Sequence, residues 1–239
     1  MLILGLDSSA VAGSCALCDI NGEKKTVIAA SFVNTKLTHS QTLMPMVEDM
    51  LKSCGFGLRD VDLLAVNSGP GSFTGIRIGV AAVKGIAFAL DKPCVGVSTL
   101  HSLAYNLAGG HCIACAVMDA RCNQFYNALF EVNAEKLTRI TPDRAISAAD
   151  LAEELNQYTD KKIVLVGDGA ELAYRSINTE NIALAPLTVR LQRAENVCLA
   201  AAEYESVTAR ELLPAYLRLP QAERERLAKI NENKTEEKQ

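Results

Sequence analysis

The chain has 239 residues, enough for one large domain or two small ones. Hydrophobic residues make up 49% and charged residues 22% of it, a balance typical of globular rather than disordered proteins. The formal net charge of −4 argues against a surface built mainly to grip nucleic acid, although a subunit whose partners hold RNA stays compatible with it. No basic segment precedes the apolar residues 1–6, so we expect no signal peptide and a cytoplasmic protein.

Apolar runs and turn residues predict the first half of the chain in order. Strands are expected at 2–6, 13–20 and 26–33, the last two joined by a hairpin turn at Asn21-Gly22. A helix follows at 40–54, where apolar residues recur at helical spacing. Next come a strand at 61–66, a helix at 74–90, a strand at 94–97 and a helix at 98–108.

The second half repeats this order. Strands are expected at 113–118, 124–132 and 136–141, a helix at 147–157, a strand at 163–166 and a helix at 170–176. Each half therefore predicts antiparallel strands joined to parallel units, with helices covering the sheet, which is an α/β fold. This duplicated plan resembles the actin, hexokinase and Hsp70 fold, with lobes at 1–108 and 109–218 and a charged tail at 219–239.

Residues 68–72 read Ser-Gly-Pro-Gly-Ser, which favours a tight turn with unusual backbone angles. A P-loop would need Gly-x4-Gly-Lys-Ser/Thr, and no lysine stands at the required place. We expect Thr74 to cap the next helix. That helix is rich in small residues, which lowers helix propensity and predicts close approach of another backbone or of a partner helix.

The same helix contains Arg77 and Lys84, and we expect it to be too short to span a bilayer. The chain has eight cysteines, among them the pairs Cys15/Cys18 and Cys112/Cys115. Residues three apart on a strand face opposite sides, so these pairs predict buried thiols rather than a zinc site. Disulfides are not expected in a reducing compartment.

A few turns could carry nucleotide chemistry, because carboxylates, hydroxyls and backbone N–H groups meet there. The alternative interpretation is that these are ordinary inherited turn residues. The candidate residues for a vestigial nucleotide site are Asp7, Ser8, Ser9, Asp119, Gly167, Asp168 and Gly169. The chain has three histidines, and none of their spacings places two on one helix face, so we expect neither a metal nor a cofactor.

One long motif resembles a known family. Residues 68–79, Ser-Gly-Pro-Gly-Ser-Phe-Thr-Gly-Ile-Arg-Ile-Gly, followed by Gly-Val-Ser-Thr-Leu at 96–100, are similar to the TsaB (YeaZ) family. Residues 4–9, His39-Ser40-Gln41, Asp119-Ala120-Arg121 and the Pro-Ala-Tyr-Leu-Arg run at 214–218 are similar too. The resemblance therefore extends from the first residues to about residue 218.

The resemblance implies the actin-like fold and a role in making N6-threonylcarbamoyladenosine (t6A) at position 37 of tRNAs that read codons beginning with A. It implies assembly with the paralogous transferase TsaD and the ATPase TsaE, a homodimer when TsaD is absent, and contact with tRNA only through the complex. An older family label, M22 glycoprotease, attaches by similarity, but the sequence offers no protease site to support it.

The comparison with TsaD also predicts that this chain lacks the transferase metal site. The two metal-binding histidines of TsaD fall on Thr99 and Leu103 here. Leucine cannot bind a metal and a neutral threonine hydroxyl is a poor ligand. We therefore expect a noncatalytic subunit; the alternative is a nucleotide-binding ATPase or phosphotransferase that uses Asp7 and Asp168.

The predicted partner surface lies on the helices at 40–54 and 74–90. Small residues on the second helix would allow close helix crossing, and methionines would supply adaptable apolar contacts. The expected contact residues are His39, Leu43, Met44, Met46, Val47, Met50, Thr74, Gly75, Ile78, Gly79, Ala82, Val83 and Ile86.

Overall fold

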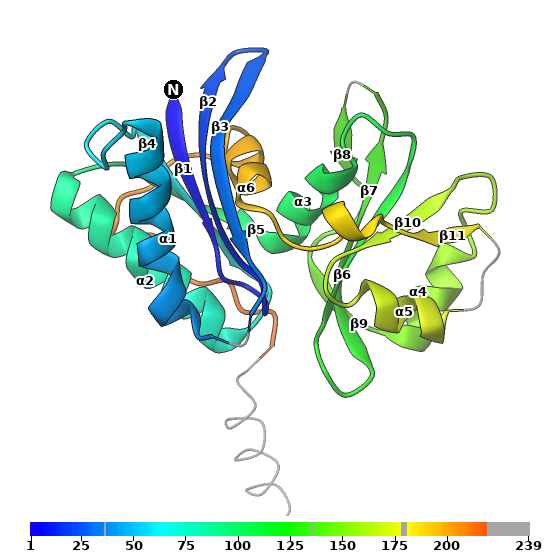
Figure 1. Cartoon of the computed structure of the whole chain (residues 1–239). Coiled ribbons are helices and arrows are strands. Elements are labelled where there is room, and N and C mark those ends of the chain that lie inside the picture. Colours follow the sequence, from blue (N-terminus) through cyan, green and yellow to red (C-terminus); the bar gives the residue numbers. More distant parts are fainter. Residues whose placement is uncertain (36, 135, 178–180, 219–239) are drawn as a thin grey trace, which may run out of the picture.

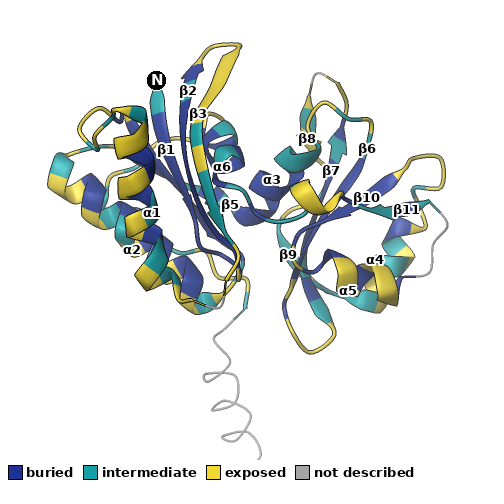
Figure 2. Ribbon diagram, viewed as in Figure 1, coloured by how far each residue is buried: buried dark blue, intermediate teal, exposed yellow. Residues whose placement is uncertain are grey.

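The computed structural model of the chain describes residues 1–35, 37–134, 136–177 and 181–218. These residues form two lobes, each built on one β-sheet with helices on both faces (Figure 1). The strands are mostly buried, whereas the outer faces of the helices are exposed (Figure 2). The charged tail predicted at 219–239 lies outside the described residues.

The first lobe has a five-stranded sheet in the order β3-β2-β1-β4-β5. Strands β1, β2 and β3 pair antiparallel, whereas β1, β4 and β5 pair parallel. Helices α1 and α2 cover one face and α6 covers the other. The bounds are β1 Leu2–Asp7, β2 Gly13–Asn21, β3 Lys24–Val33, α1 His39–Cys54, β4 Leu63–Gly69, α2 Phe73–Leu90, β5 Cys94–Ser98 and α6 Ala194–Ala201.

The second lobe has a six-stranded sheet whose main order is β11-β10-β6-β7-β8, with β9 paired to β7. Helix α3 packs on one face, and α4 and α5 pack on the other. The bounds are α3 Thr99–Ala104, η1 Tyr105–Leu107, β6 Cys112–Asp119, β7 Gln124–Val132, β8 Leu137–Arg139, β9 Arg144–Ser147, α4 Ala148–Leu155, β10 Ile163–Val166, α5 Ala170–Ser176, β11 Ile182–Leu184 and η2 Leu187–Val189.

The two sheets repeat one topology, so the predicted duplicated α/β fold of the actin-like class is confirmed. In each, the first strand pairs antiparallel with the second and parallel with a later strand: β1 with β2 and β4, and β6 with β7 and β10. A further parallel strand, β5 or β11, completes each unit. The second lobe departs from the plan at its third strand, where a single strand was predicted at 136–141 and the structure instead has β8 and, beyond a turn, β9.

Two helices pack on the sheet formed by the opposite half of the sequence. Helix α3, in the predicted first lobe, packs on β6 and β7 of the second sheet, and α6, in the predicted second lobe, packs on β1 and β2 of the first. After α6 the chain stays on the first lobe, where Val207 pairs with Cys94 and Leu212 is buried beside α2. The lobe boundaries at residues 108 and 218 stay a prediction. Helices α3 and α6 both pack across the boundary at residue 108, each on the sheet of the other half.

Local details of two helices differ from expectation. Ser72, not Thr74, caps α2: its side-chain oxygen accepts a hydrogen bond from the N–H of Gly75 at 3.3 Å, so the predicted cap was wrong. The expected helix at 98–108 ends as α3 at Ala104 and continues as a single 3-10 turn. Thr38 stands at the N-cap position of α1 but makes no side-chain capping bond.

The prediction that the two cysteines of each pair face opposite sides of a strand is confirmed, and three of the four thiols are buried, whereas Cys112 is half-buried. Cys15 packs towards α1 and α2 while Cys18 packs towards α6, and Cys112 and Cys115 likewise contribute to different cores of the second lobe. Neither pair can therefore close on one metal ion.

The membrane prediction needs correction. Among the described helices, α2 alone is long and apolar enough to cross a membrane by length and composition, so it is not too short. Its buried side, which includes Ile76, Val80 and Val83, packs in the core of the first lobe. Apolar helices in the cores of proteins have the same length and composition as membrane-spanning ones. These two properties of α2 therefore indicate burial in the protein as readily as insertion into a membrane.

Candidate functional site between the two lobes

A cleft with a volume of ≈ 790 Å³ lies between the lobes, at the end where β1, β2 and β3 converge and the C-terminal segment passes (Figure 1). The first lobe contributes Ser9, His39, the turn at 70–72 and the start of α2, and the second contributes Asp119, Arg121 and Asp168. The structure therefore brings together the turns that the sequence singled out at distant positions. Ligands of α/β sheets bind at such carboxyl ends of strands.

Asp7 lies beneath the cleft and is fully buried. Its carboxylate accepts a hydrogen bond from the Asn67 side-chain amide at 2.5 Å and one from the backbone N–H of Ser9 at 2.6 Å. Burial raises the pKa of Asp7 above its usual value, and these hydrogen bonds oppose the rise. Asp7 is thus fixed by two hydrogen bonds, in a buried site that disfavours the ionised form of its carboxyl group.

Asp168 faces the cleft from the second lobe and keeps access to solvent. The surrounding protein nevertheless raises the pKa of Asp168 to about 6, while a hydrogen bond from Gln192 at 2.9 Å opposes the shift. The negative charges of Asp119 and Asp7 push the pKa of Asp168 in the same direction as burial. Asp7 of the first lobe therefore lies close enough to Asp168 of the second for their charges to interact.

The small residues at the start of α2 are explained by packing within the chain. A Cβ on Gly75 would lie 2.0 Å from the backbone oxygen of Ser8, and a Cβ on Gly79 would lie 2.5 Å from the Ser8 hydroxyl. The Ser8 hydroxyl also donates to the carbonyl of Gly75 at 2.8 Å. The close backbone approach that the sequence predicts is thus the approach of α2 to the turn after β1.

The glycines of the second lobe are likewise required by packing. Gly167 has a φ of 122°, and a Cβ there would lie 2.0 Å from the backbone oxygen of Val117. A Cβ on Gly169 would lie 2.8 Å from the backbone of Met118. Close packing between the ends of β6 and β10 is sufficient reason for both glycines, whether or not a ligand binds.

The predicted partner residues on α1 and α2 divide by exposure. Met44 is 38% exposed, and several others are exposed or half-buried: His39, Met46, Thr74, Ile78 and Ala82. The rest lie in the core of the first lobe: Leu43, Val47, Met50, Gly75, Gly79, Val83 and Ile86. Only the first group presents side chains that a partner can meet, so the predicted surface narrows to it.

Thr99 and Leu103, the positions compared with metal-binding histidines, are fully buried on α3. Leu103 belongs to the second-lobe core. Among the residues that the structure describes, no three or more His, Cys, Asp or Glu side chains are grouped so that they could hold a metal ion.

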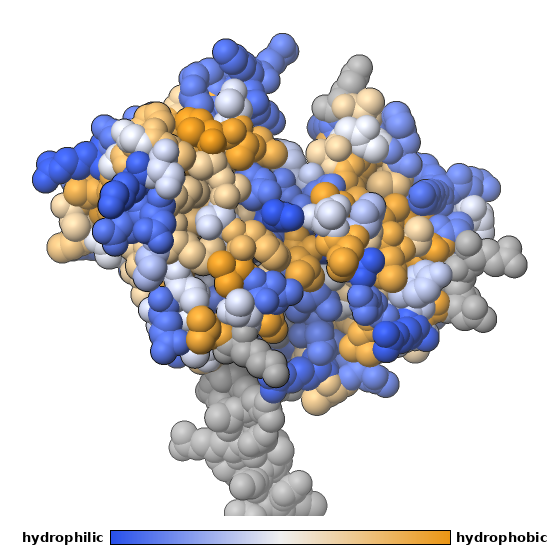
Figure 3. Space-filling view, in the orientation of Figure 1, coloured by the Kyte–Doolittle hydropathy of each residue, from blue (hydrophilic) through white to orange (hydrophobic). Residues whose placement is uncertain are grey.

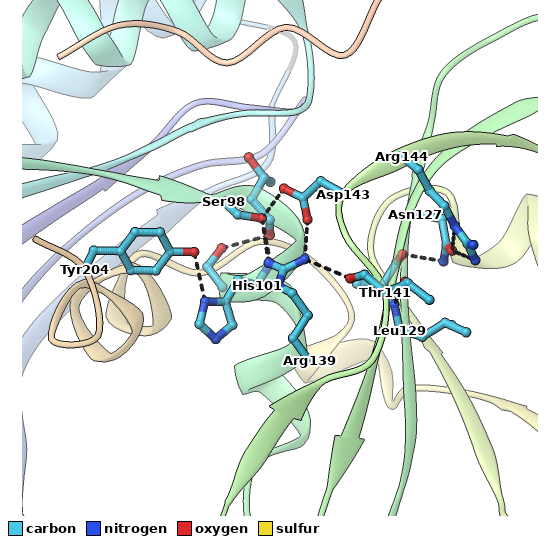
Figure 4. Close-up of polar contacts among 12 residues, drawn as sticks. Ser98, His101, Asn127, Leu129, Arg139, Thr141, Asp143, Arg144 and Tyr204 are labelled. Carbon is cyan, nitrogen blue, oxygen red and sulfur yellow. Dashed lines mark hydrogen bonds and ion pairs between the residues drawn. The ribbon is translucent and has the colours of Figure 1, made fainter. Parts of the chain in front are cut away.

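His101, between those two positions, belongs to a polar network where the lobes join (Figure 4). Its Nδ1 lies 3.0 Å from the Tyr204 hydroxyl, and its ring stacks on Phe130. Nearby, Ser98 at the end of β5 donates to Asp143 of the second lobe at 2.6 Å. These residues connect the first lobe to the β8–β9 turn.

Sequence reasoning missed the role of the C-terminal segment. The Arg77 side chain donates to the Tyr216 hydroxyl at 2.7 Å and stacks on Phe73 with 3.8 Å to the ring centroid. Arg218 then reaches the second lobe, donating to the backbone oxygen of Ala120 at 2.8 Å. The Pro-Ala-Tyr-Leu-Arg run was the available signal, but the partners of Tyr216 and Arg218 lie 139 and 98 positions away in the sequence.

Comparison with known proteins identifies the family. A family model described as "TsaD: tRNA N6-adenosine threonylcarbamoyltransferase" matches residues 32–234. The chain is 31% identical to the "tRNA threonylcarbamoyladenosine biosynthesis protein TsaB" of Bacillus subtilis, across 93% of this chain and 96% of that protein. It is also 31% identical to the Escherichia coli protein of the same description, across 91% of this chain and 95% of that one.

Solved structures agree with these relatives. "YeaZ from Pseudomonas aeruginosa" superimposes with a TM-score of 0.75 at 28% identity, covering 90% of this chain and 99% of that one. By contrast, the threonylcarbamoyltransferase of Novosphingobium aromaticivorans aligns over only 46% of this chain and 41% of its own length. The TsaB protein of Bacillus subtilis thus aligns over nearly the whole of both chains, whereas this transferase aligns over less than half of either. The chain belongs to the TsaB (YeaZ) family, within the wider TsaD family whose model it matches.

Proposed function

We propose that this chain is a noncatalytic subunit of the bacterial machinery that makes threonylcarbamoyladenosine at position 37 of tRNAs reading codons that begin with A. The observation that carries the proposal is the similarity to TsaB proteins over more than nine-tenths of the chain. In this proposal the chain supports a TsaD-type transferase together with a TsaE-type ATPase, and meets tRNA only within the complex. The cytoplasm, where tRNA is processed, is the compartment that follows.

The noncatalytic role is supported by the positions that correspond to the transferase histidines. Thr99 and Leu103 are both fully buried, and a leucine side chain offers no atom that could bind a metal. The chain would therefore contribute to the reaction by binding and shaping its partner.

The partner surface in this proposal is the exposed side of α1 and the first turns of α2, centred on Met44, Met46 and Ile78. Methionine adapts its shape to a facing surface, and an apolar centre with a polar rim is typical of protein interfaces. When no TsaD is present, a second copy of this chain would use the same surface. Figure 3 shows apolar residues over both lobes on the face that it displays, so hydropathy alone does not select this surface.

The decisive experiment combines binding and activity. A tagged chain is co-expressed with a TsaD protein and a TsaE protein, and the purified complex is given tRNA, threonine, bicarbonate, ATP and the enzyme that makes the threonylcarbamoyl donor. Mass spectrometry of tRNA nucleosides should detect the modified adenosine with the full set and none with this chain alone. Failure to co-purify with TsaD, or full modification without this chain, would refute the proposal.

A second candidate function is nucleotide binding in the interlobe cleft, where the carboxylate of Asp168 would hold the magnesium ion that accompanies the phosphates. Calorimetry with ATP and magnesium on the isolated chain tests it. We expect no saturable heat, because packing already engages the turn at Ser8 and Ser9. Tight binding and turnover that disappear in Asp7→Ala would make the chain an enzyme in its own right.

A further inference from the structure

Arg77 is an exposed arginine on α2 whose guanidinium group is held in place by aromatic neighbours. Its Cζ lies 3.8 Å from the centroid of the Phe73 ring and 5.7 Å from that of the Tyr216 ring. The two rings also contact each other, with 4.9 Å between their centroids. Nε of Arg77 donates a hydrogen bond to the Tyr216 hydroxyl at 2.7 Å. Stacking and this hydrogen bond together restrict a side chain that otherwise has many rotamers.

Tyr216 is itself fixed by contacts on both sides of it in the chain. The backbone N–H of Ala215 donates to the backbone oxygen of Ser68 at 2.7 Å. Two residues beyond Tyr216, the Arg218 side chain donates to a backbone oxygen of the second lobe at 2.8 Å. The C-terminal segment therefore keeps the Tyr216 hydroxyl beside α2, and Tyr216 is a positioning residue for Arg77.

The terminal nitrogens of Arg77 have no partner among the residues that the structure describes. Neither Nη1 nor Nη2 makes a hydrogen bond or an ion pair there. By contrast, Arg139, Arg144 and Arg190 each have a terminal nitrogen 2.5 or 2.6 Å from a carboxylate oxygen. The neighbours of Arg77 are a hydroxyl and two aromatic rings, so no opposite charge neutralises it. An open arginine fork matches the paired oxygens of a carboxylate or a phosphate.

Arg77 lies at the edge of the proposed partner surface. It directly precedes Ile78, which belongs to the centre of that surface, and Thr74 and Ala81 on the same side of α2 are exposed. Protein interfaces combine an apolar centre with a polar rim, and arginine is enriched in them. An acidic side chain of a protein docked on α1 and α2 would therefore meet Arg77 at the rim.

We propose that Arg77 is a preorganised receptor for one carboxylate, supplied by an aspartate or glutamate of the protein that docks on α1 and α2. This inference rests on the partner surface of the proposed function, and it adds the chemistry that the partner presents there. Nη1 and Nη2 donate to the two carboxylate oxygens, while Nε keeps its hydrogen bond to Tyr216. Because stacking already restricts the side chain, binding costs little further conformational freedom.

A phosphate group of RNA is the other ligand that fits this fork. The protein carboxylate is favoured for two reasons. Arg77 adjoins apolar residues such as Ile78, which suit a protein interface better than a phosphate backbone. The formal net charge of −4 also opposes the approach of a polyanion to the isolated chain. Binding of tRNA by the chain alone is therefore measured beside binding of the protein partner.

The test is calorimetric titration of the full chain with a TsaD protein. Arg77→Met removes the charge and keeps an apolar stem, and we expect its Kd to rise at least about tenfold. Arg77→Lys keeps the charge but loses the fork, so its Kd should rise about three- to fivefold. Arg175→Met, which alters an arginine of α5 whose side chain is 80% exposed, is the matched control and should bind like the unaltered chain.

Salt dependence separates a charge pair from a merely structural effect. The Kd of the unaltered chain should rise more steeply with KCl than that of Arg77→Met, because salt screens the pair that the variant lacks. Tyr216→Phe removes the hydrogen bond that orients Nε but leaves the charge, so it should weaken binding less than Arg77→Met. If Arg77→Met acted only by loosening the C-terminal segment, Tyr216→Phe would match it and the salt dependence would not change.

Met44→Glu, measured in the same series, distinguishes this inference from the proposed function. Weaker binding by Met44→Glu with unaltered binding by Arg77→Met would refute the carboxylate receptor and leave the partner surface intact. Unaltered binding by both variants, or no binding of TsaD by the unaltered chain, would refute both. The receptor is also refuted if Arg77→Met keeps the full salt dependence, or if it loses affinity for tRNA but not for TsaD.

Discussion

Two glycines of helix α2 show how residue identity is set by immediate surroundings. A Cβ on Gly75 would lie 2.0 Å from a backbone oxygen, that of Ser8, whereas a Cβ on Gly85 would meet nothing within 4 Å. Both residues are helical, so neither needs glycine for its backbone angles. Gly75 is therefore required by packing, and Gly85 is not.

The two positions make a matched pair of mutations. Gly75→Ala should lower the free energy of unfolding by about 1–3 kcal/mol, because the turn after β1 must move to admit a methyl group. Gly85→Ala should raise it by about 0.4–1 kcal/mol, because alanine restricts the unfolded chain and favours helix. Urea denaturation measures both. Equal effects at the two positions would contradict the packing argument.

His101 gives a pH dependence with a definite sign. Burial lowers the pKa of His101 in the folded protein, more than the nearby Glu203 carboxylate raises it. An unfolded histidine has a pKa of about 6.5, so below that value the unfolded chain binds the proton first. The stability contributed by neutral His101 is thus present above about pH 6.5 and is lost as pH falls towards its lowered pKa.

We expect the free energy of unfolding to fall between about pH 7.5 and pH 5, and the slope to become shallower in His101→Gln. The groups that face the imidazole are the same in both proteins: Tyr105, Arg139, Asp143, Glu203 and Tyr204. His111→Gln, which alters an exposed histidine, is the control. An unchanged slope in His101→Gln would show that other groups govern the titration.

At the residue scale, the sequence predicts the character of a position, such as the face of a strand that it occupies, better than it predicts which residues a side chain contacts. Alternation along a strand was enough to place Cys15 and Cys18 on opposite faces. The cap of α2 was misplaced by two residues, because Ser72 and Thr74 have equal capping chemistry and the turn geometry decides between them. The link between Arg77 and Tyr216 is a contact between distant segments, which a single sequence does not encode in any local pattern.

At the element scale, the exposed side of α1 is the part of the predicted partner surface that can be altered without disturbing the core. Met44→Glu should weaken association with a TsaD partner at least about tenfold, because it places a charge at an apolar contact. Leu172→Glu on α5 is a matched control, since Leu172 is 43% exposed and Met44 is 38% exposed. Both variants should unfold at the same temperature as the unaltered chain.

Size-exclusion chromatography and calorimetry with TsaD report the result. Equal binding by both variants would exclude Met44 from the interface. Gly79 is unsuitable for this test, because a Cβ there would lie 2.5 Å from the Ser8 hydroxyl and 3.1 Å from a Val66 methyl group. A bulky residue at that position would disturb folding, whatever its effect on binding.

Long helices and strands with a clear period of apolar residues were predictable from the sequence, and short ones were not. The strands and helices of the first lobe up to β5 agree with expectation to within a few residues. The elements β9, β11 and α6 were missed: β11 has three residues, β9 has four, and α6 follows Arg193, which makes no capping bond. Tertiary packing rather than local signal stabilises such elements.

At the scale of the whole molecule, the two lobes do not correspond to consecutive halves of the chain, because each half contributes a helix to the other lobe. Helix α6 covers a face of the first sheet built from residues of β1, β2 and β5, and its own Val197 and Cys198 complete that core. Leu212, further along, is buried against α2. A break at residue 108 would therefore leave the first sheet bare on one side, and would remove α3 from the sheet that it covers.

This arrangement predicts that fragments 1–108 and 109–218 do not fold alone. Each would expose an apolar sheet face, and the loss of that burial exceeds the few kcal/mol by which a domain is stable. Circular dichroism in the near ultraviolet and thermal melts should show no cooperative transition for either fragment. Co-expression is the control, because fragments that fail only for want of the exchanged helices should associate and recover one transition. Cooperative unfolding of fragment 1–108 by itself would mean that α6 is dispensable and that the lobes are independent domains, with the boundary where sequence periodicity alone places it.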